Sequence, residues 1–268
     1  MKKYIVSILS LLLFNSCEEV IELELPEGEP RLVIEAVINK SISAQAEYEN
    51  YVRLSLTAPF YENNNPAVSD ASIQLTGSNG FVVNYFETGE PGVYLPEFSF
   101  APADEEQYTL NIIYNNETYQ AVTTLVKGTH LTGIEQGDSS LFGEEETEII
   151  ISFTDNGDRE DYYLFDLGYG LYFTSKDEFF NGQDFSFSYF YEDLDPGDNV
   201  NVNLINVTKD FYTYMSILIS QSGINGGNPF AAIPGTVKGN FNNLNTPSRI
   251  AYGYFRISEV DRASLIVE

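Results

Sequence analysis

The alternation of apolar and polar side chains restricts the fold of this chain more than any other feature of its sequence. Val52, Leu54 and Leu56 alternate with Arg53 and Ser55. A period of two over such a run is typical of a strand with one buried face. The same period recurs in residues 31–38, 149–153, 163–173 and 185–191, and residues 250–257 form a late strand-like run. The sequence therefore predicts a mostly β protein.

Two turn signals divide the first strands into hairpins. Residues 77–80, Gly-Ser-Asn-Gly, separate two strand-like runs, and an Asn-Gly pair accepts the positive φ angles of a tight turn. Asn115 and Asn116 separate a second pair of runs. Short strands with regularly spaced turns predict an antiparallel β-sandwich over residues 31–127.

A second β-rich domain is expected over residues 132–268, with a linker near residues 127–132. Gly168 and Gly170 interrupt its longest alternating run and indicate a bulge or a close approach of two backbones. One helix is expected, which Thr208 can cap and Gly223 would end. Its apolar face follows helical spacing and consists of Phe211, Tyr214, Met215, Leu218 and Ile219.

The first twenty residues have the pattern of a bacterial export signal. Lys2 and Lys3 precede the apolar run 5–14, which is about half the ~20 residues that a membrane-spanning helix needs. Cys17 follows at once and is the only cysteine, so the chain can form no intramolecular disulfide. We predict that residues 1–16 are removed and that Cys17 carries a lipid. An ordinary cleaved signal with an incidental cysteine is the alternative.

The charge balance limits the partners of this chain. Thirteen basic residues face 40 acidic ones, a formal net charge of −27. Such a surface repels nucleic acid and anionic lipid headgroups, so we expect no nucleic-acid partner. The lipid on Cys17 would then supply the membrane attachment. Residues 17–30 are acidic and rich in Pro and Gly, and we interpret them as a tether between the lipid and the folded part.

Few residues suit catalysis. His130 is the only histidine, which excludes a His-rich zinc site, and it lies in the predicted linker. No Gly-x-Ser-x-Gly motif accompanies it, so a serine triad is not expected. Paired carboxylates are the remaining catalytic possibility, because glycoside hydrolysis needs only two acids at a suitable distance. With 40 acidic residues, no single pair can be selected.

Calcium is the one cofactor that the sequence suggests. Asp155, Asp158 and Asp161 place carboxylate oxygens close together, and calcium binds six to eight oxygens. The spacing does not fit the regular Asp-x-Asp-x-Asp-Gly loop. Asp, Asn and Gly also form ordinary turns, and that interpretation is favoured because it already explains the residue types.

Aromatic residues outside the alternating runs are candidates for a partner surface. Phe180 and Phe230 fall in loop-like segments, and exposed aromatic side chains in loops often contact partners. We therefore predict that these two side chains bind a partner.

Short motifs lie across most of the chain, at residues 31–35, 52–55, 58–60, 68–73, 91–94, 108–110, 161–163, 182–183, 228–230 and 253–255. Together they resemble a family of Bacteroidota lipoproteins classed as a domain of unknown function. The resemblance implies an outer-membrane lipoprotein with an N-terminal immunoglobulin- or transthyretin-like sandwich. The acidic residues directly after Cys17 favour the cell-surface face, because they resemble the export tag of some lipoproteins. The resemblance also implies a TonB-dependent β-barrel receptor as partner, because members are often encoded beside such receptors. No catalytic residues come with it.

Together these observations predict a non-enzymatic, lipid-anchored binding protein, as an accessory subunit of a TonB-dependent uptake system. A structural or adhesive surface module is the first alternative. A carboxylate-dependent glycoside hydrolase is the second. The sequence does not identify the ligand.

Overall fold

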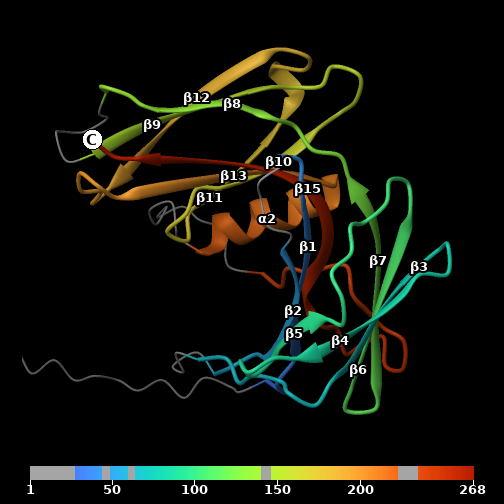
Figure 1. Ribbon diagram of the computed structural model, residues 1–268. Helices are drawn as coiled ribbons and strands as arrows, with labels where there is room; N and C mark the ends of the chain where they lie inside the picture. The colour runs from blue at the N-terminus through green and yellow to red at the C-terminus, as the bar shows by residue number, and fades with distance from the viewer. Residues whose placement is uncertain (1–27, 44–48, 60–63, 140–145, 223–234) are drawn as a thin grey trace, which may run out of the picture.

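The computed structural model describes residues 28–43, 49–59, 64–139, 146–222 and 235–268 (Figure 1). Within these residues the chain is mostly β, as predicted. Twelve strands join into one sheet, three more form a second sheet, and a single α-helix lies beside them.

Eight strands of the large sheet close into a barrel-like structure. Their order around it is β15-β1-β2-β5-β4-β3-β6-β7, and β7 returns to pair with β15. Side chains of all eight strands meet in one buried core. The bounds are β1 Leu32–Ser41, β2 Glu49–Leu56, β3 Ser72–Gly77, β4 Val82–Glu87, β5 Val93–Pro96, β6 Gln107–Tyr114, β7 Glu117–Val126 and β15 Tyr252–Ile266.

This closure corrects the prediction of an N-terminal sandwich. The alternation in residues 31–127 identifies one buried face on each strand, but it does not say whether the sheet folds against a second layer or closes on itself. The closing strand, β15, comes from the far end of the sequence. It pairs in parallel with β1, with Ile34 opposite Gly253, and in parallel with β7, with Leu125 opposite Ile257.

The remaining strands form a two-layered part. β8 Leu131–Gln136, β9 Glu146–Thr154 and β12 Asp184–Glu192 make the three-stranded sheet. It faces β10 Tyr162–Asp166, β11 Tyr172–Lys176, β13 Asn199–Val207 and the second half of β15, and both layers contribute to a second, aromatic core. β14 Asn242–Asn243 pairs with β7 at the edge of the barrel-like sheet.

β15 belongs to both parts. Residues 252–260 pair with β1, and residues 260–266 pair with β13. The predicted division near residues 127–132 assigned all of β15 to the second domain, whereas this strand also completes the barrel. In Figure 1, β15 runs from the barrel-like part at the lower right into the two-layered part above.

The predicted hairpin turns are confirmed. Gly80 has a φ of 90° between β3 and β4, and Asn115 and Asn116 have φ angles of 51° and 59° between β6 and β7. One predicted strand is wrong. Residues 163–173 form two strands, β10 and β11, because the φ angles of Gly168, Tyr169 and Gly170 are all positive and turn the chain into a hairpin.

The predicted helix is confirmed as α2, Lys209–Ser222. The side-chain oxygen of Thr208 accepts a hydrogen bond from the backbone N–H of Phe211 at 3.2 Å, as expected of an N-cap. Gly223, its predicted end, lies outside the described residues. A short 3₁₀ turn, η2, spans Asp177–Phe179. In Figure 1, α2 lies below β10, β11 and β13 and beside β1.

Candidate functional site

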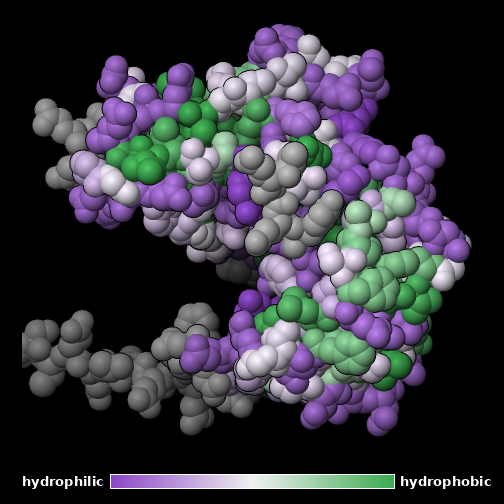
Figure 2. Space-filling model, viewed as in Figure 1, coloured by the Kyte–Doolittle hydropathy of each residue, from purple (hydrophilic) through white to green (hydrophobic). Residues whose placement is uncertain are grey.

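A cavity of about 350 Å³ lies where the two parts meet. Its walls come from α2, from β10, β11 and β13 of the two-layered part, and from β1, β2 and β15 of the barrel-like part. Figure 2 shows a deep indentation between the two parts on one side of the molecule. The volume lies in the range of small-molecule sites, which commonly form at the junction of two structural units.

The apolar wall of the cavity is the face of α2 that the sequence predicts to be buried. Phe211, Tyr214, Met215 and Leu218 all line the cavity, but of these only Phe211 is buried. Leu164 and Ile205 complete the wall from β10 and β13. Phe211, Leu164 and Ile205 also belong to a buried apolar cluster, and Tyr214 and Met215 pack against it. The parts of these side chains that face the cavity offer contact area to a ligand.

Arg256 is the central polar group of the cavity. Its Nη1 donates a hydrogen bond to Oδ1 of Asn39 at 2.5 Å, and the guanidinium lies 5.7 Å from the ring centroid of Phe211. Among the described residues, no carboxylate oxygen lies within 4.0 Å of its nitrogens. Burial lowers the pKa of Arg256. An arginine nevertheless stays protonated in proteins, so the cavity holds a positive charge with one neutral partner.

Three carboxylates surround Arg256, and each is held by other groups. Glu49 accepts hydrogen bonds from Asn39 at 2.6 Å and from Arg262 at 2.9 Å. Asn203 in turn accepts one from Arg262 at 2.5 Å and donates one to Asp166 at 3.1 Å. The result is a continuous polar network across β1, β2, β10, β13 and β15. Such a network orders the wall of the cavity.

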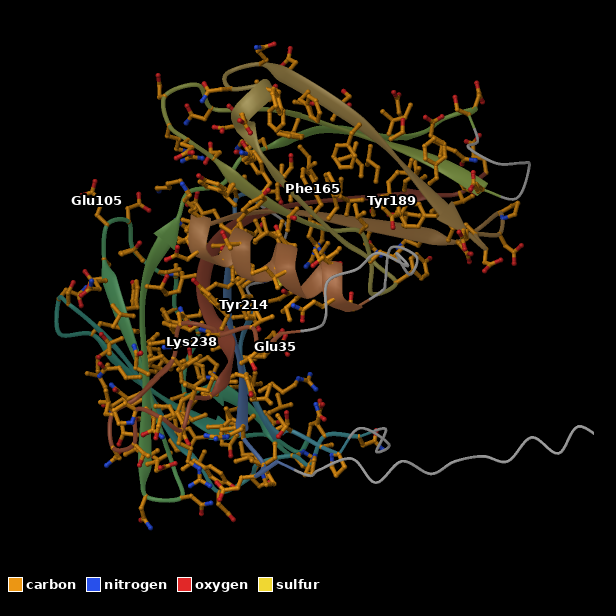
Figure 3. The ribbon with its side chains drawn as sticks, turned by 180° about the vertical axis from the view of Figure 1, so that it is seen from behind. Glu35, Glu105, Phe165, Tyr189, Tyr214 and Lys238 are labelled. Carbon is orange, nitrogen blue, oxygen red and sulfur yellow. The ribbon has the colours of Figure 1, made fainter. Side chains whose placement is uncertain are left out.

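The third carboxylate, Glu35, lies near α2. Its Oε1 accepts a hydrogen bond from the hydroxyl of Tyr51 at 2.5 Å. Burial and then the charge of Glu35 raise the pKa of Tyr214 to about 12. Figure 3 shows Glu35 on β1 below Tyr214 on α2.

Two tyrosine hydroxyls in the cavity lack an internal partner. Within the described part of the chain, the hydroxyls of Tyr172 and Tyr214 make no hydrogen bond, and both side chains line the cavity. Burial, as the largest cause, raises the pKa of Tyr172. Each hydroxyl is therefore a neutral donor and acceptor at neutral pH and can contact a ligand.

The structure gives the predicted calcium residues other partners. Asp155 is buried, and its two oxygens accept hydrogen bonds from the hydroxyl of Tyr163 and, at 2.7 Å, from the backbone N–H of Gly182. Asp158 is exposed. Asp161 is buried, and its carboxylate accepts two hydrogen bonds from Nε of Arg159 at 2.9 Å.

These contacts tie loops to the aromatic core and do not form a shared site. Burial raises the pKa of Asp161 although Arg159 lies beside it. Among the described residues, no group of three or more His, Cys, Asp or Glu side chains is placed to hold a metal ion.

The expectation that Phe180 is an exposed partner contact is wrong. Phe180 is 5% exposed and stacks on Phe185, with ring centroids 4.2 Å apart. The preceding residue, Phe179, is 87% exposed. A position outside the alternating runs does not show which of two neighbouring side chains points to solvent. Phe230 and Cys17 lie outside the described residues.

His130 is exposed at the start of β8. Its Nδ1 lies 3.4 Å from Oδ2 of Asp261, and its side chain is 70% exposed. It does not line the cavity.

The sequence analysis did not identify Arg256. The signal was present, because residues 252–257 alternate and Arg256 falls on the same side of the strand as Tyr252 and Tyr254. Arg256 is the cation in that aromatic stripe. Its lack of a direct ion pair with the described carboxylates, however, depends on five strands that come together only in the fold.

Comparisons with known proteins give a family and no named activity. Residues 18–264 match the family described as Domain of unknown function (DUF4249). No curated protein matches the chain. Among the described residues, no helix has the length and apolarity needed to cross a membrane.

Two solved structures illustrate how distant the structural matches are. A DUF4785 family protein from Legionella pneumophila is 10% identical over 65% of this chain, with a TM-score of 0.24, and the match spans 52% of that protein. A segment of two fibronectin type III domains from chicken tenascin is 14% identical over 67% of this chain and 91% of that one, with a TM-score of 0.21.

Proposed function

The chain belongs to the DUF4249 family, and we propose that it is a lipid-anchored binding protein of the outer membrane that holds a small ligand in the cavity beside α2. The lining of the cavity carries this proposal. It combines an aromatic helix face, two free tyrosine hydroxyls and a cation with one neutral partner. Small-molecule sites typically join such an apolar wall to a few fixed polar groups.

The same lining favours binding without catalysis. The polar residues around Arg256 are fixed in mutual hydrogen bonds, and within the described part of the chain the cavity wall contains no Ser, Cys or His that could serve as a nucleophile or a neutral-pH base. This proposal requires that the protein releases its ligand unchanged.

A pair of tryptophan substitutions on α2 tests the cavity as the binding site. Leu218→Trp adds bulk inside the cavity, while Ile217→Trp places the same side chain on the outer side of α2, where Ile217 is 39% exposed. Small aromatic acids, amides and amines are screened by ligand-detected NMR. We expect the compounds that bind wild type to be lost in Leu218→Trp and kept in Ile217→Trp. Equal binding to both variants would exclude this cavity.

The anchor is tested by fatty-acid labelling in cells of the native host. We expect label on the wild type and none on Cys17→Ser, since the thiol is the proposed attachment point. Label on both proteins would refute lipidation at Cys17.

For the partner we propose a TonB-dependent β-barrel receptor, which would make this protein an accessory subunit of an uptake system. The outer face of the barrel-like sheet supports a protein contact, because Phe86, Ile113 and Val122 are 59%, 50% and 44% exposed. In Figure 2, apolar side chains gather on this part of the molecule.

Affinity capture of the full-length protein from native membranes should recover such a receptor, and Phe86→Ser should reduce the yield. If no receptor is recovered, and if cells that lack this protein attach more weakly to surfaces, the alternative of an adhesive surface module would be favoured.

The glycoside hydrolase is kept as a second candidate because Glu35, Glu49 and Asp166 line one cavity. A panel of glycans incubated with the wild type tests it directly. Hydrolysis that disappears in both Glu35→Gln and Asp166→Asn would replace the binding proposal, while intact glycans would exclude this reaction for that panel.

A further inference from the structure

We infer that the ligand of the cavity carries a carboxylate, which pairs with Arg256, on an apolar body that lies against α2. This inference rests on the proposed function, since it names the chemical class that the same cavity takes. It starts from the guanidinium of Arg256, which lies in the cavity with no carboxylate of the described residues within 4.0 Å.

Arg256 has far more hydrogen-bonding capacity than the described residues use. A guanidinium presents five N–H donors, and here one nitrogen, Nη1, donates to Asn39. Burying a cation without an ionic partner is costly. The other nitrogens are not fully enclosed, because none of them is among the buried atoms without a partner. They can therefore be reached from the cavity that Arg256 lines.

The neighbouring carboxylates contact other groups and do not form an ion pair with Arg256. Glu49 is held by Asn39 and Arg262, and Asp166 is held by Asn203. Glu35 accepts from Tyr51, and its other oxygen lies 3.8 Å from Arg53, on the exposed side of β2. Each acid is thus directed to a partner other than Arg256, and the position opposite the guanidinium is left to an external anion.

A carboxylate fits this position better than a phosphate or a sulfate. The planar fork of an arginine matches a carboxylate in a bidentate pair. Glu35, Glu49 and Asp166 line the same cavity and the chain carries a net charge of −27, so the repulsion grows with every further negative charge on the ligand. A singly charged anion keeps that repulsion to a minimum.

The apolar body follows from the opposite wall. Phe211, Met215 and Leu218 form a continuous strip of α2, and Phe211 lies directly beside the guanidinium. A ligand whose carboxylate reaches Arg256 therefore places its next atoms against this strip. The hydroxyls of Tyr172 and Tyr214 can contact polar groups farther along the ligand.

Three probes of one shape test the inference: 3-phenylpropionate, 3-phenylpropionamide and 3-phenylpropylamine. Binding to the full folded protein is measured by isothermal titration calorimetry at pH 7. We expect the carboxylate to bind roughly tenfold to a hundredfold more tightly than the amide, the range given by a charge-assisted hydrogen bond. The amine should bind least, because Arg256 repels it.

Two variants assign the preference to Arg256. Arg256→Gln should bind acid and amide about equally, and Arg256→Lys should keep part of the preference because it retains the charge but loses the fork. Arg249→Gln is the charge-matched control, since it removes one cation far from the cavity, and it should keep the wild-type ranking.

The outcomes distinguish the carboxylate inference from the proposal that the cavity binds a small ligand. Equal binding of the three probes to wild type, or tighter binding of the amine, overturns the carboxylate inference and leaves a binding cavity. A preference that survives in Arg256→Gln also overturns it. If no probe binds wild type, both the inference and the small-ligand cavity fail. The ranking on wild type decides the question even if Arg256→Gln does not fold.

Discussion

The barrel core and the cavity are lined by alternate residues of the same two strands. On β1, Ala36 points into the barrel core while Glu35 faces the cavity, and on β15 Phe255 and Arg256 divide in the same way. The core side is apolar and tightly enclosed, whereas the cavity side is polar and open to small molecules. One pair of strands thus supplies stability with one face and a site with the other.

The substitution with the largest expected effect disrupts both the barrel core and the cavity. Gly253 has a φ of 96°, and a Cβ there would lie 1.9 Å from the carbonyl oxygen of Ile34 on β1. Gly253→Ala should therefore cost more than about 4 kcal/mol and yield little folded protein. Urea denaturation measures the loss. Gly89→Ala, with no atom within 4 Å of the added Cβ, is the control and should be close to neutral.

Shortening one side chain on each face compares how tightly the barrel core and the cavity wall are packed. Ile257 is fully buried in the barrel core, so Ile257→Ala should cost about 2–5 kcal/mol in the free energy of unfolding. Met215 lines the cavity and is only partly buried against the cluster that includes Phe211, so Met215→Ala should cost about 1 kcal/mol or less. Chemical denaturation of both variants provides the comparison. Similar losses would mean that the α2 face is packed as a core and that the cavity is closed in solution.

The strand periodicity was sufficient to predict the core face but not the site. Residues such as Leu54 and Ile257 could be assigned to a buried face because a period of two is a local property. The closure of the barrel by β15 and the position of Arg256 in the cavity depend on pairings between distant segments, which periodicity does not contain. The error at Phe180 has a different cause, because a position outside the alternating runs does not show which of Phe179 and Phe180 is exposed.

Two charged residues on β15, Glu259 and Arg256, extend the comparison to ionic groups. Glu259 accepts hydrogen bonds from Lys40 and from the backbone N–H of Gly128, both at 2.9 Å. Burial raises the pKa of Glu259, but these contacts outweigh it, so the net pKa lies below the usual 4.5. The depressed pKa means that Glu259 stabilises the fold above about pH 4.5 and that this contribution is lost as the pH falls through the lower, folded-state pKa.

Glu259→Gln tests whether the ionised carboxylate of Glu259 stabilises the fold. The variant should be less stable than wild type by about 1–3 kcal/mol at pH 7, and the difference should disappear in acid once Glu259 of the wild type is protonated. Urea denaturation at a series of pH values measures both. A difference that stays constant down to acid pH would show that the carboxylate charge does not contribute.

Arg256 is expected to behave in the opposite way, with the smallest effect on stability. It lacks the direct ionic partner that Glu259 has, so replacing it removes the desolvation cost of the guanidinium, one hydrogen bond to Asn39 and the contact with the Phe211 ring. Arg256→Met should therefore change the free energy of unfolding by no more than about 1 kcal/mol, in the stabilising direction, while it lowers the affinity for 3-phenylpropionate. A loss of several kcal/mol would instead make Arg256 a structural residue. Gain in stability with loss of binding is the result that a residue kept for its ligand produces, because the carboxylate that pairs directly with it arrives only with that ligand.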